Sequence, residues 1–454
     1  MIDVIVLAAG KGTRMKSSLP KVLNTIGGKS MVEHVIDSAS FINNARVHLV
    51  VGHQADKLKE ALSHREINFV EQAQQLGTGH AVQMALPDIQ PWGVSLILYG
   101  DVPLISASTL QQLIKLVDET SLALLTVHME DPTGYGRIVR DRDDNAIAIV
   151  EHKDADAGQL AIHEINTGIM AVNNEDLVKY LPKLENNNRQ GEYYLTDLIA
   201  MAVADGKNIR TVEPDSPEEV LGVNTRLQQA ELERYYQYNQ AQKLLESGTH
   251  LLDPNRIDVR GELVCDDGVS IDANCIFEGK VTLGENTVIE SNCIIKNAVI
   301  GKGVVIKAFS HLEDVVISDG CDVGPYARLR PGTELANGAK IGNFVEVKKS
   351  KIGIGSKVNH LSYIGDAEIG EGTNIGAGTI TCNYDGVNKH LTKIGDDVFV
   401  GSNTALVAPV EIESGSTIGA GSTITKSVPK DQLALTRPEQ VHKSSWVRPT
   451  KKKS

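Results

Sequence analysis

A glycine-rich segment with two nearby cations follows the first apolar run of the chain. Residues 7–15 read LAAGKGTRM, and Lys21 comes soon after in Leu-Pro-Lys. Glycines at a strand end expose backbone N–H groups to a phosphate, and Arg14 and Lys21 add two fixed positive charges. The segment is neither a P-loop nor a dinucleotide-binding G-x-G-x-x-G fingerprint. Gly10 and Gly12 alone also suit an ordinary turn, whereas the whole combination favours phosphate chemistry.

A carboxylate stands at the end of another apolar run. Asp101 follows residues 96–99 within the segment YGDVPL. Open α/β sheets bind ligands at the carboxyl ends of their strands. Carboxylate oxygens suit a hard cation such as Mg²⁺, so Asp101 is a candidate metal ligand. The alternative is a residue that merely caps the strand end.

The second half of the chain contains a candidate base. Acyl transfer to an amine needs a group that accepts a proton near neutral pH, and histidine suits that task. A lone His360, in Asn-His-Leu-Ser-Tyr, would more often be structural. However, Arg330 and Lys348 precede it and could hold a sugar phosphate, and a polar insertion at 381–390 follows it. These neighbours favour a catalytic histidine.

The first half of the chain alternates apolar runs with amphipathic segments, which predicts an α/β domain with a mostly parallel sheet to about residue 225. The expected strands include residues 2–7, 47–51, 96–99, 123–127 and 169–172, and the expected helices include 31–41 and 109–118. Residues 226–247 lack glycine and proline and predict one long helix closed by Gly248. This helix is expected to link two domains.

Aliphatic residues recur every six positions in the second half, which predicts a parallel β-helix. The repeat includes Ile271, Phe277, Leu283, Ile289, Ile295, Ile300, Ile306, Leu312, Ile317, Val323, Leu329, Leu335, Ile341, Val347, Ile352, Val358, Ile364, Ile369 and Ile375, and then Ile394 to Ile424. The phase slips by one residue at 295–300, 312–317, 347–352 and 364–369, and the sequence offers no reason for it. The insertion at 381–390 is expected to project as a loop. The predicted domains are 1–226, a linker helix over 227–250, and 251–454.

Composition narrows the class of protein. The formal net charge of −13 argues against a general nucleic-acid-binding surface but not against small anionic substrates. Five cysteines without a CxxC pair predict neither a zinc site nor a disulfide framework, which favours reduced thiols in the cytoplasm. No apolar run is long enough to span a membrane, and the first strand lacks the features of a signal peptide. The basic residues at 448–453 are typical of a solvated chain end.

The N-terminal motifs resemble the signature of the sugar-1-phosphate nucleotidyltransferases, L-x-x-G-x-G-T-x-M with a following P-K. The resemblance implies that Mg²⁺ binds Asp101 and Asn224, and that Arg14 and Lys21 stabilise charge on the leaving pyrophosphate. It also implies contacts to UDP-N-acetylglucosamine from Leu7, Ala8, Ala9, Gly10, Lys21, Gln72, Gly77, Thr78, Tyr99, Gly100, Asp101, Gly136, Glu151, Asn166 and Asn224.

The second half resembles the hexapeptide-repeat acyltransferases. Over nearly its full length the chain is similar to the bacterial family of bifunctional N-acetylglucosamine-1-phosphate uridyltransferase/glucosamine-1-phosphate acetyltransferases. That resemblance implies a Rossmann-like α/β nucleotidyltransferase domain followed by a left-handed parallel β-helix. It makes His360 the catalytic base and Glu346 a residue that orients or polarises the substrate amine. The implied contacts to glucosamine-1-phosphate are Arg330, Lys348, Tyr363 and Asn374, and those to acetyl-CoA are Ala377, Asn383, Tyr384, Ser402, Ala420 and Arg437.

The expected function is the synthesis of UDP-N-acetylglucosamine for peptidoglycan and lipopolysaccharide precursors. The chain would acetylate glucosamine-1-phosphate with acetyl-CoA and then transfer UMP from UTP to N-acetylglucosamine-1-phosphate. We expect a cytoplasmic homotrimer, without nucleic acid or membrane insertion. Two alternatives are a single nucleotidyltransferase whose β-helix only regulates or oligomerises, and a scaffold without activity. Neither explains why His360, Arg330 and the loop at 383–384 occur together.

Overall fold

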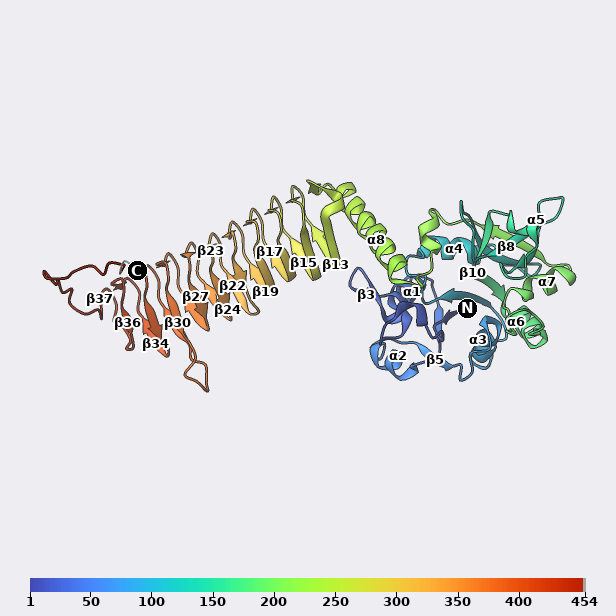
Figure 1. The fold of residues 1–454 in the computed structure, drawn as a ribbon, viewed down its shortest axis with the longest axis horizontal. Helices are drawn as coiled ribbons and strands as arrows, with labels where there is room; N and C mark the ends of the chain where they lie inside the picture. Colours follow the sequence, from blue (N-terminus) through green and yellow to red (C-terminus); the bar gives the residue numbers. More distant parts are fainter. Residues whose placement is uncertain (452–454) are drawn as a thin grey trace. The chain divides into compact units, whose positions relative to one another are not determined.

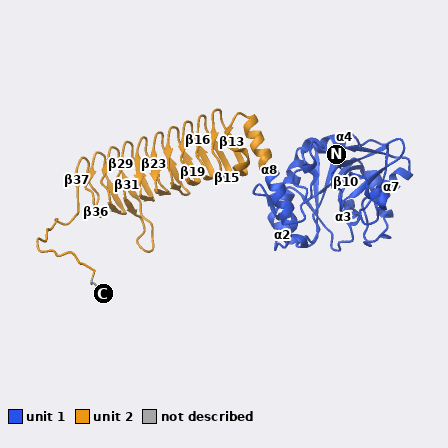
Figure 2. Ribbon diagram, turned by 45° about the horizontal axis from the view of Figure 1, so that its top comes forward, with its two compact units in different colours: residues 1–236 blue, residues 237–454 orange. Residues whose placement is uncertain are grey.

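A computed structural model describes residues 1–451 of the chain. The chain divides into two compact units, Met1–Tyr236 and the part from Gln237 onward (Figure 2). Residues 452–454 lie outside the described part, and so does the end of the predicted basic tail. Within residues 1–451, no helix is long and apolar enough to cross a membrane.

Unit 1 is built on a nine-stranded sheet with the order β11-β7-β10-β6-β1-β4-β5, joined at β10 by β8 and β9 (Figure 1). Its strands are β1 (Ile2–Leu7), β4 (Ala45–Val51), β5 (Asn68–Glu71), β6 (Val94–Tyr99), β7 (Ser121–His128), β8 (Gly136–Arg140), β9 (Ala146–Val150), β10 (Glu164–Asn173) and β11 (Asn208–Val212). A separate hairpin joins β2 (Thr25–Ile26) to β3 (Lys29–Ser30). The central pairs are parallel, whereas β10 is antiparallel to its neighbours.

Helices cover both faces of this sheet, with a separate apolar core beneath each layer. They are α1 (Met31–Ser40), α2 (Ala55–Ala61), α3 (Thr78–Ala85), α4 (Ala107–Lys115), α5 (Ala157–Leu160), α6 (Asn174–Tyr180) and α7 (Asp197–Ala204). The central strand β1 is almost continuously apolar because it is covered from both sides. In register, Leu7 lies beside Val50 and Tyr99. The segments that follow β1 and β6 therefore leave the sheet at the same edge.

The fully buried carboxylate of Asp3 ties together the opposite edge of the sheet. It accepts hydrogen bonds from Arg46 (2.6 Å), His48 (3.0 Å), Asn174 (3.1 Å) and the backbone N–H of Gln90 (3.2 Å). Burial acts to raise the pKa of Asp3, but the bonds from His48 and Arg46 outweigh it and lower that pKa. Asp3 is therefore held as a charged anchor rather than as a reactive acid.

The long helix α8 (Arg226–Glu246) ends before Gly248, whose φ is +95°. Leu232 and Tyr236, in its first half, pack in unit 1, and Ala241 and Leu244, in its second half, belong to the core of unit 2. The backbone at Gly27 fits against the ring of Tyr236, where any added Cβ would clash. Helix α8 is thus an integral part of each unit's packing.

Unit 2 is a parallel β-helix whose short strands stack into three faces. The first face contains β12 (His250–Leu251), β14 (Ser270–Ile271), β16 (Val288–Ile289), β18 (Val305–Ile306), β20 (Asp322–Val323), β23 (Lys340–Asn343), β26 (Lys357–His360), β29 (Asn374–Ile375), β32 (Phe399–Val400), β35 (Thr417–Ile418) and β37 (Leu433–Ala434). The second face contains β21 (Arg328–Leu329), β24 (Glu346–Lys348), β27 (Tyr363–Gly365), β30 (Ile380–Cys382), β33 (Ala405–Val407) and β36 (Thr423–Ile424). The third face contains β22 (Thr333–Leu335), β25 (Lys351–Ile352), β28 (Ala367–Ile369), β31 (Thr392–Ile394) and β34 (Val410–Ile412).

The earliest coils use longer strands that run through the second and third faces. These strands are β13 (Ile257–Cys265), β15 (Cys275–Leu283), β17 (Ile294–Ile300) and β19 (His311–Ile317), the last of which pairs with both β21 and β22. The periodic aliphatic residues point inward and form one continuous core. The predicted fold class, a Rossmann-like α/β domain followed by a left-handed parallel β-helix, is confirmed.

The structure explains the four slips of the six-residue phase. Each slip contains one residue in the left-handed region: Asn297 (φ 46°), Asp314 (48°), Lys349 (44°) and Asp366 (47°). These residues turn the corner between the second and third faces in a path that is one residue shorter. The ladder between β15 and β17 therefore changes at Asn297 from 18 to 17 residues per coil, whereas the ladder between β17 and β19, which both contain a short corner, stays at 17. Asn and Asp tolerate this conformation better than most side chains. The slips are therefore tight corners rather than breaks in the fold.

We predict that Asp3→Ala lowers the free energy of unfolding of unit 1 by about 3 kcal/mol, because it leaves the buried His48 and Asn174 without their acceptor. Since the pKa of Asp3 is lowered on folding, this stabilisation is present above its ordinary value of 3.8 and is lost as the pH falls through the folded value. Urea unfolding at pH 7 and at acidic pH measures both effects. Glu130→Ala removes an exposed carboxylate of the same unit and should leave the midpoint unchanged; equal losses in both variants would contradict this role of Asp3.

Candidate active sites

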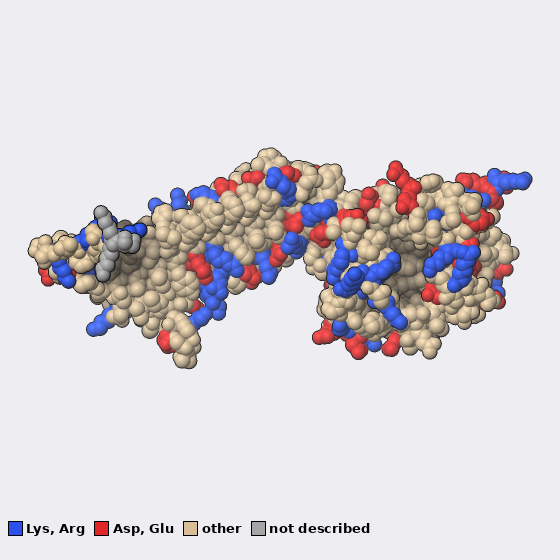
Figure 3. Space-filling view, viewed as in Figure 1, with Lys and Arg blue, Asp and Glu red and all other residues tan. Residues whose placement is uncertain are grey.

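A hollow of about 230 Å³ opens at the sheet edge where β1 and β6 end. Many of the residues predicted to bind the nucleotide line it: Leu7, Ala8, Ala9, Gly10, Lys21, Gln72, Gly77, Thr78, Tyr99 and Asp101. Gly100 is fixed beside them by its backbone bond to Leu7 (3.0 Å). Figure 3 shows Lys and Arg side chains on both sides of a recess in unit 1. The structure thus gathers segments that are far apart in the sequence into one polar cavity.

The predicted cations and metal ligands converge on one point of this site. The Lys21 ammonium forms an ion pair with the Asp101 carboxylate and donates to Asn224 Oδ1 at 3.0 Å. Arg14 Nη2 donates to the same Asn224 oxygen at 2.9 Å. Gly12 has φ +58°, and a Cβ there would lie 2.6 Å from Lys21 Cβ. A side chain at position 12 would therefore push Lys21 away from Asp101.

The two oxygens around Lys21 have the chemistry of a magnesium site. Asp101 supplies a carboxylate and Asn224 an amide oxygen, and both already face one positive charge. Mg²⁺ takes such oxygens and usually completes its shell with water and substrate phosphates. No group of three or more His, Cys, Asp or Glu in residues 1–451 could hold a metal by itself. The donor set therefore fits Mg²⁺ that arrives with a phosphate ligand.

The segment from Gln72 to Thr78 forms one side of the hollow and is fixed by hydrogen bonds. Gln72 is buried and donates to the Gly77 carbonyl (3.1 Å) and contacts His80 Nδ1 (3.0 Å). Gly77 has φ +118°, and a Cβ there would meet the Tyr193 carbonyl oxygen at 2.6 Å. Sequence reasoning missed Glu192, which also lines the hollow. Only the fold brings this residue to the Gly77 turn, so no local motif marks it.

Gly136 and Glu151 lie near Tyr99 at the same sheet edge. A Cβ on Gly136 would lie 3.6 Å from the Glu151 carboxylate, which accepts a bond from Thr196 (3.2 Å). Burial raises the pKa of Glu151, and burial together with the nearby Glu151 and Asp101 charges raises that of Tyr99. A half-buried carboxylate whose pKa is raised can accept further hydrogen bonds from a ligand's hydroxyl groups.

Asn166 lies on β10, next to a close backbone approach. Its Oδ1 accepts from the Gly168 N–H at 3.1 Å. Gly168 has φ +85°, and a Cβ there would lie 2.5 Å from the Tyr99 ring. The predicted sugar-binding residues therefore meet around Tyr99.

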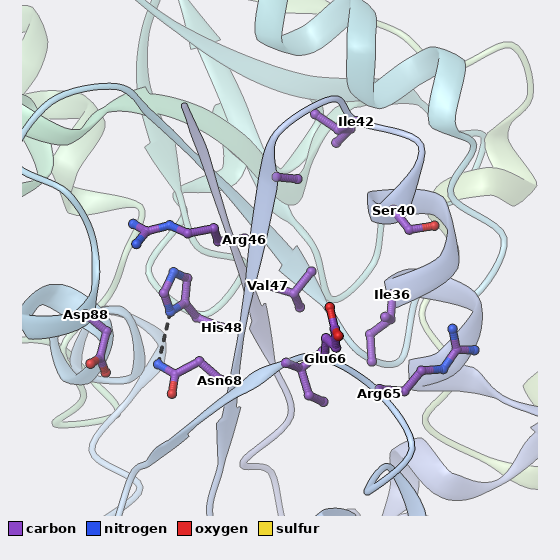
Figure 4. A pocket seen from close by; sticks show the side chains of 12 residues that line it. Ile36, Ser40, Ile42, Arg46, Val47, His48, Arg65, Glu66, Asn68 and Asp88 are labelled. Carbon is purple, nitrogen blue, oxygen red and sulfur yellow. Dashed lines mark hydrogen bonds between the residues drawn. The ribbon is translucent and has the colours of Figure 1, made fainter.

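A larger hollow of about 630 Å³ lies at the opposite edge of the sheet, by the starts of β4 and β5 (Figure 4). Arg46 and His48 line it, but both are committed to Asp3, and Arg65 is paired with Asp37 at 2.8 Å. His48 also contacts Asn68 at 3.2 Å. None of the predicted site residues lines this hollow. The basic residues of this hollow, Arg46, His48 and Arg65, therefore serve the packing of the fold.

In unit 2, His360 lies exposed at the corner between the first and second faces, which we call the first corner. Its Nδ1 is 2.8 Å from Oδ1 of Asn343, the ladder partner of His360 on the preceding coil. Since an amide oxygen can only accept, Nδ1 carries the proton in the neutral ring. This arrangement leaves the Nε2 lone pair to accept a proton from a ligand.

Three residues predicted to contact acetyl-CoA continue from His360 along the first corner. Backbone bonds connect the successive coils: Gly378 N–H to the His360 carbonyl (3.2 Å), Asn403 N–H to Ala377 (2.7 Å) and Gly421 N–H to Ser402 (2.8 Å). Arg437 Nη1 donates to the Ala420 carbonyl at 3.1 Å. His360, Ala377, Ser402 and Ala420 thus form a row parallel to the helix axis.

The cations predicted to bind the phosphate, Arg330 and Lys348, lie at one edge of the second face. Arg330 and Lys348 are neighbours where β21 and β24 end, and Arg330 pairs with Glu346 at 2.7 Å. Tyr363, on the next coil, packs over Gly365, where a side chain would clash with its hydroxyl. Asn374, in contrast, lies on the first face in β29. One copy of the chain therefore does not gather all four residues on one face.

The inserted loop brings a cation that the motif comparison missed. Lys389 is the main cause of a lowered pKa of Lys348, to which Arg330 adds. Asn383 donates to the Asp366 carboxylate nearby, and Tyr384 folds back on the Gly386 carbonyl (2.5 Å). Figure 3 shows Lys and Arg side chains gathered where this loop leaves the β-helix. Three positive charges held close together predict a site for an anion. The sequence motifs did not identify Lys389, because it lies in the inserted loop and outside the six-residue repeat.

Comparison with protein families separates the same two parts of the chain. Residues 4–248 match the MobA-like NTP transferase domain. Residues 259–337 match the GMPPB C-terminal domain, and residues 391–426 match the bacterial transferase hexapeptide (six repeats).

Full-length relatives cover both parts together. The chain is 59% identical over 452 residues to the bifunctional protein GlmU of Cellvibrio japonicus, with all of both chains covered. It is 55% identical over 450 residues to the bifunctional protein GlmU of Marinobacter nauticus, with 99% of each covered. A solved nucleotidyl transferase from Methanothermobacter thermautotroptrophicus is 20% identical, with a TM-score of 0.38, and covers 52% of this chain and 97% of its own.

Proposed function

This chain belongs to the family of bifunctional GlmU proteins, and we propose from that premise which residues carry each of its two reactions. It is a uridyltransferase and a glucosamine-1-phosphate acetyltransferase, and it makes UDP-N-acetylglucosamine for the cell wall. The assignment rests on one observation: each unit has its own group of polar side chains suited to one of the two reactions. Lys21, Asp101 and Asn224 converge in unit 1, and a row that begins at His360 runs along unit 2.

In the uridylyl transfer, a phosphate oxygen of N-acetylglucosamine-1-phosphate attacks the α-phosphorus of UTP, and pyrophosphate leaves. The attacking oxygen is already anionic, so no strong base is needed. Mg²⁺, held by Asp101 and Asn224, would offset the repulsion between the phosphates. Arg14 and Lys21 stabilise the charge that develops on pyrophosphate. Lys21 reaches both oxygens of the metal site, so it is placed to act on the same phosphates.

The hollow around β1 and β6 binds the nucleotide, and the sugar lies beyond it on the far side of Tyr99. The wall from Gln72 to Thr78 takes the uridine, because its backbone and amide groups are fixed and polar. Gly136, Glu151 and Asn166 take the sugar on the side of Tyr99. Glu151 is half-buried and its pKa is raised, so hydrogen bonds from sugar hydroxyl groups would compensate for its partial burial.

In the acetyl transfer, His360 Nε2 takes the proton from the amine of glucosamine-1-phosphate as its nitrogen attacks the thioester carbonyl of acetyl-CoA. The new N–C bond forms, the C–S bond breaks, and CoA leaves as a thiolate. Asn343 keeps the imidazole ring in the required orientation. Ser402 or a backbone N–H of the same corner stabilises the oxyanion.

The remaining predicted residues hold the two substrates of acetyl transfer. Arg330 and Lys348, together with Lys389, bind the sugar phosphate, and Tyr363 lies beside it. Glu346 pairs with Arg330, so we propose that it positions this guanidinium group rather than the amine. The residues that contact acetyl-CoA are Ala377, Asn383, Tyr384, Ser402, Ala420 and Arg437.

We also propose a cytoplasmic homotrimer that shares its acetyltransferase sites between neighbouring subunits. Asn374 and Lys348 lie on different faces of one chain, so a neighbour's face would complete the substrate site. Three-faced β-helices aligned in parallel can pack side by side around a threefold axis. All five cysteines are free thiols, as expected in the cytoplasm.

The proposed domains are 1–226 for uridylyl transfer, a linker helix over 227–250, and 251–454 for acetyl transfer. Leu232 and Tyr236 pack in the core of unit 1. A fragment made to carry uridylyl transfer alone should therefore extend to residue 246, where α8 ends.

Asp101→Ala should lower the rate of uridylyl transfer by about 10²–10⁴-fold, because it removes a metal ligand and frees the Lys21 ammonium. Acetyl transfer should be unchanged, since its residues lie in unit 2. Pyrophosphate release and thiol release from acetyl-CoA measure the two reactions on the same preparation. Glu130→Ala, which removes an exposed carboxylate of unit 1, serves as the control. Uridylyl transfer within a few-fold of normal in Asp101→Ala would refute the metal site.

His360→Ala should lower kcat of acetyl transfer by about 10²–10⁴-fold, because no other group would take the amine proton. Uridylyl transfer from pre-acetylated substrate should persist. His250→Ala, at an exposed histidine of β12, should be normal in both assays. A normal kcat for His360→Ala across neutral pH would shift the role of base to Glu346 or to a bound water.

A further inference from the structure

A fully buried arginine lies on β8 of unit 1 without an acidic partner. Arg137 is only 1% solvent-exposed and is among the largest buried side chains of the described residues. Its Nη1 donates to the Tyr135 carbonyl, whereas its Nε is buried and lacks a hydrogen-bond acceptor. Among residues 1–451, no carboxylate forms an ion pair with it. The fold therefore leaves this buried positive charge without compensation.

Arg140, on the same strand, shows how a fully paired arginine is held there. Its side chain is 25% exposed, and it donates from Nε (2.7 Å) and Nη2 (2.6 Å) to the Glu164 carboxylate. A buried charge without such a partner destabilises a fold, and an apolar residue of similar size can often replace it without loss of stability. Packing alone therefore gives no reason for an arginine at position 137.

Arg137 lies behind the residues that are proposed to hold the sugar. Consecutive residues of a strand face opposite sides of the sheet. A Cβ on Gly136 would point toward Glu151, at 3.6 Å, whereas Ile165, the ladder partner of Arg137, belongs to the core on the other face. Strand β10, which lies beside β8, places Asn166 opposite Gly136 (Figure 1). The guanidinium group therefore acts on the sugar site through the backbone that it holds.

The bond from Arg137 fixes the peptide group between Tyr135 and Gly136. This group is planar, so its carbonyl and the N–H of Gly136 point in opposite directions, and holding the first sets the direction of the second. Burial raises the pKa of Tyr135, and the charge of Asp101 adds to this effect, so the phenol lies within reach of that charge. The segment that Arg137 holds is thus next to both the sugar site and the proposed metal site.

We propose that Arg137 is a positioning residue for uridylyl transfer, an inference that rests on the function proposed above. Through the Tyr135 carbonyl it keeps the Gly136 backbone in the direction that receives N-acetylglucosamine-1-phosphate. The phosphate of this substrate also brings a negative charge near the uncompensated guanidinium group. Charges in a protein interior are screened less than charges in water. Arg137 therefore favours binding of the sugar phosphate rather than the chemical step.

The test replaces Arg137 in the full chain. Arg137→Met removes the charge and the donor but keeps an unbranched side chain. KM for N-acetylglucosamine-1-phosphate should rise about tenfold, the scale of one charge-assisted hydrogen bond, while kcat and KM for UTP stay within about twofold. The unfolding midpoint of unit 1 should stay the same or rise, because an apolar side chain replaces a buried charge. Acetyl transfer should not change.

Two results would overturn the proposal. One is a normal KM for N-acetylglucosamine-1-phosphate in Arg137→Met. The other is a lower unfolding midpoint with equal losses toward both substrates, because that is the behaviour of a residue that only packs.

Two further variants separate the charge from the packing. Arg137→Lys keeps a positive charge and a donor, so its KM for the sugar phosphate should stay within about threefold of normal. Arg142→Met is the matched control, because it removes an exposed arginine just beyond β8, and it should leave every constant unchanged. A Lys variant as impaired as Arg137→Met, or an impaired Arg142→Met, would contradict the role of the charge at position 137.

Calorimetric binding of UDP-N-acetylglucosamine gives a measurement that does not depend on turnover. Its Kd for Arg137→Met should rise by the same factor as KM for the sugar phosphate. A normal Kd in this variant would refute the role of Arg137 alone. An unaltered chain that neither binds this nucleotide sugar nor transfers UMP would instead refute the proposed function.

Discussion

In-register stacking of short parallel strands is the constraint on which the β-helix and its site depend. Each coil bonds to the next through a row of backbone groups, so a residue at a corner has its counterparts directly above and below it. This constraint turns residues 17 to 25 positions apart into one straight row from His360 to Ala420. A long extended ligand can follow such a row, which a globular core would not offer.

Unit 1 binds compact, highly charged ligands, so its site is a cluster of charged side chains rather than a long row. The parallel strands β1 and β6 end at one edge, where Gly12 gives Lys21 room to reach Asp101 and Asn224. In the structure the Lys21 ammonium stands between the two oxygens that would hold Mg²⁺. Lys21 therefore balances the negative charge of Asp101 and brings the two oxygens to one point.

The sequence was sufficient for the fold class, the six-residue repeat and helix α8, because each rests on local periodicity. It did not explain the phase slips, since these depend on left-handed corners such as Asn297 and Asp366 that only the ladder register reveals. Nor did it identify Glu192 or Lys389, which enter their sites through loops with no repeating pattern. Residues within motifs were recoverable, whereas residues placed by loop geometry were not.

The central claim is that each unit carries one reaction at its own site, and a crystal structure with CoA, UDP-N-acetylglucosamine and Mg²⁺ tests it most directly. The account predicts CoA along the first corner beside Ala377, Ser402 and Ala420, with its sulfur near His360. It predicts the metal between Asp101 and Asn224, with Lys21 moved onto a phosphate. CoA bound to the third face, or a metal held by other residues, would contradict it.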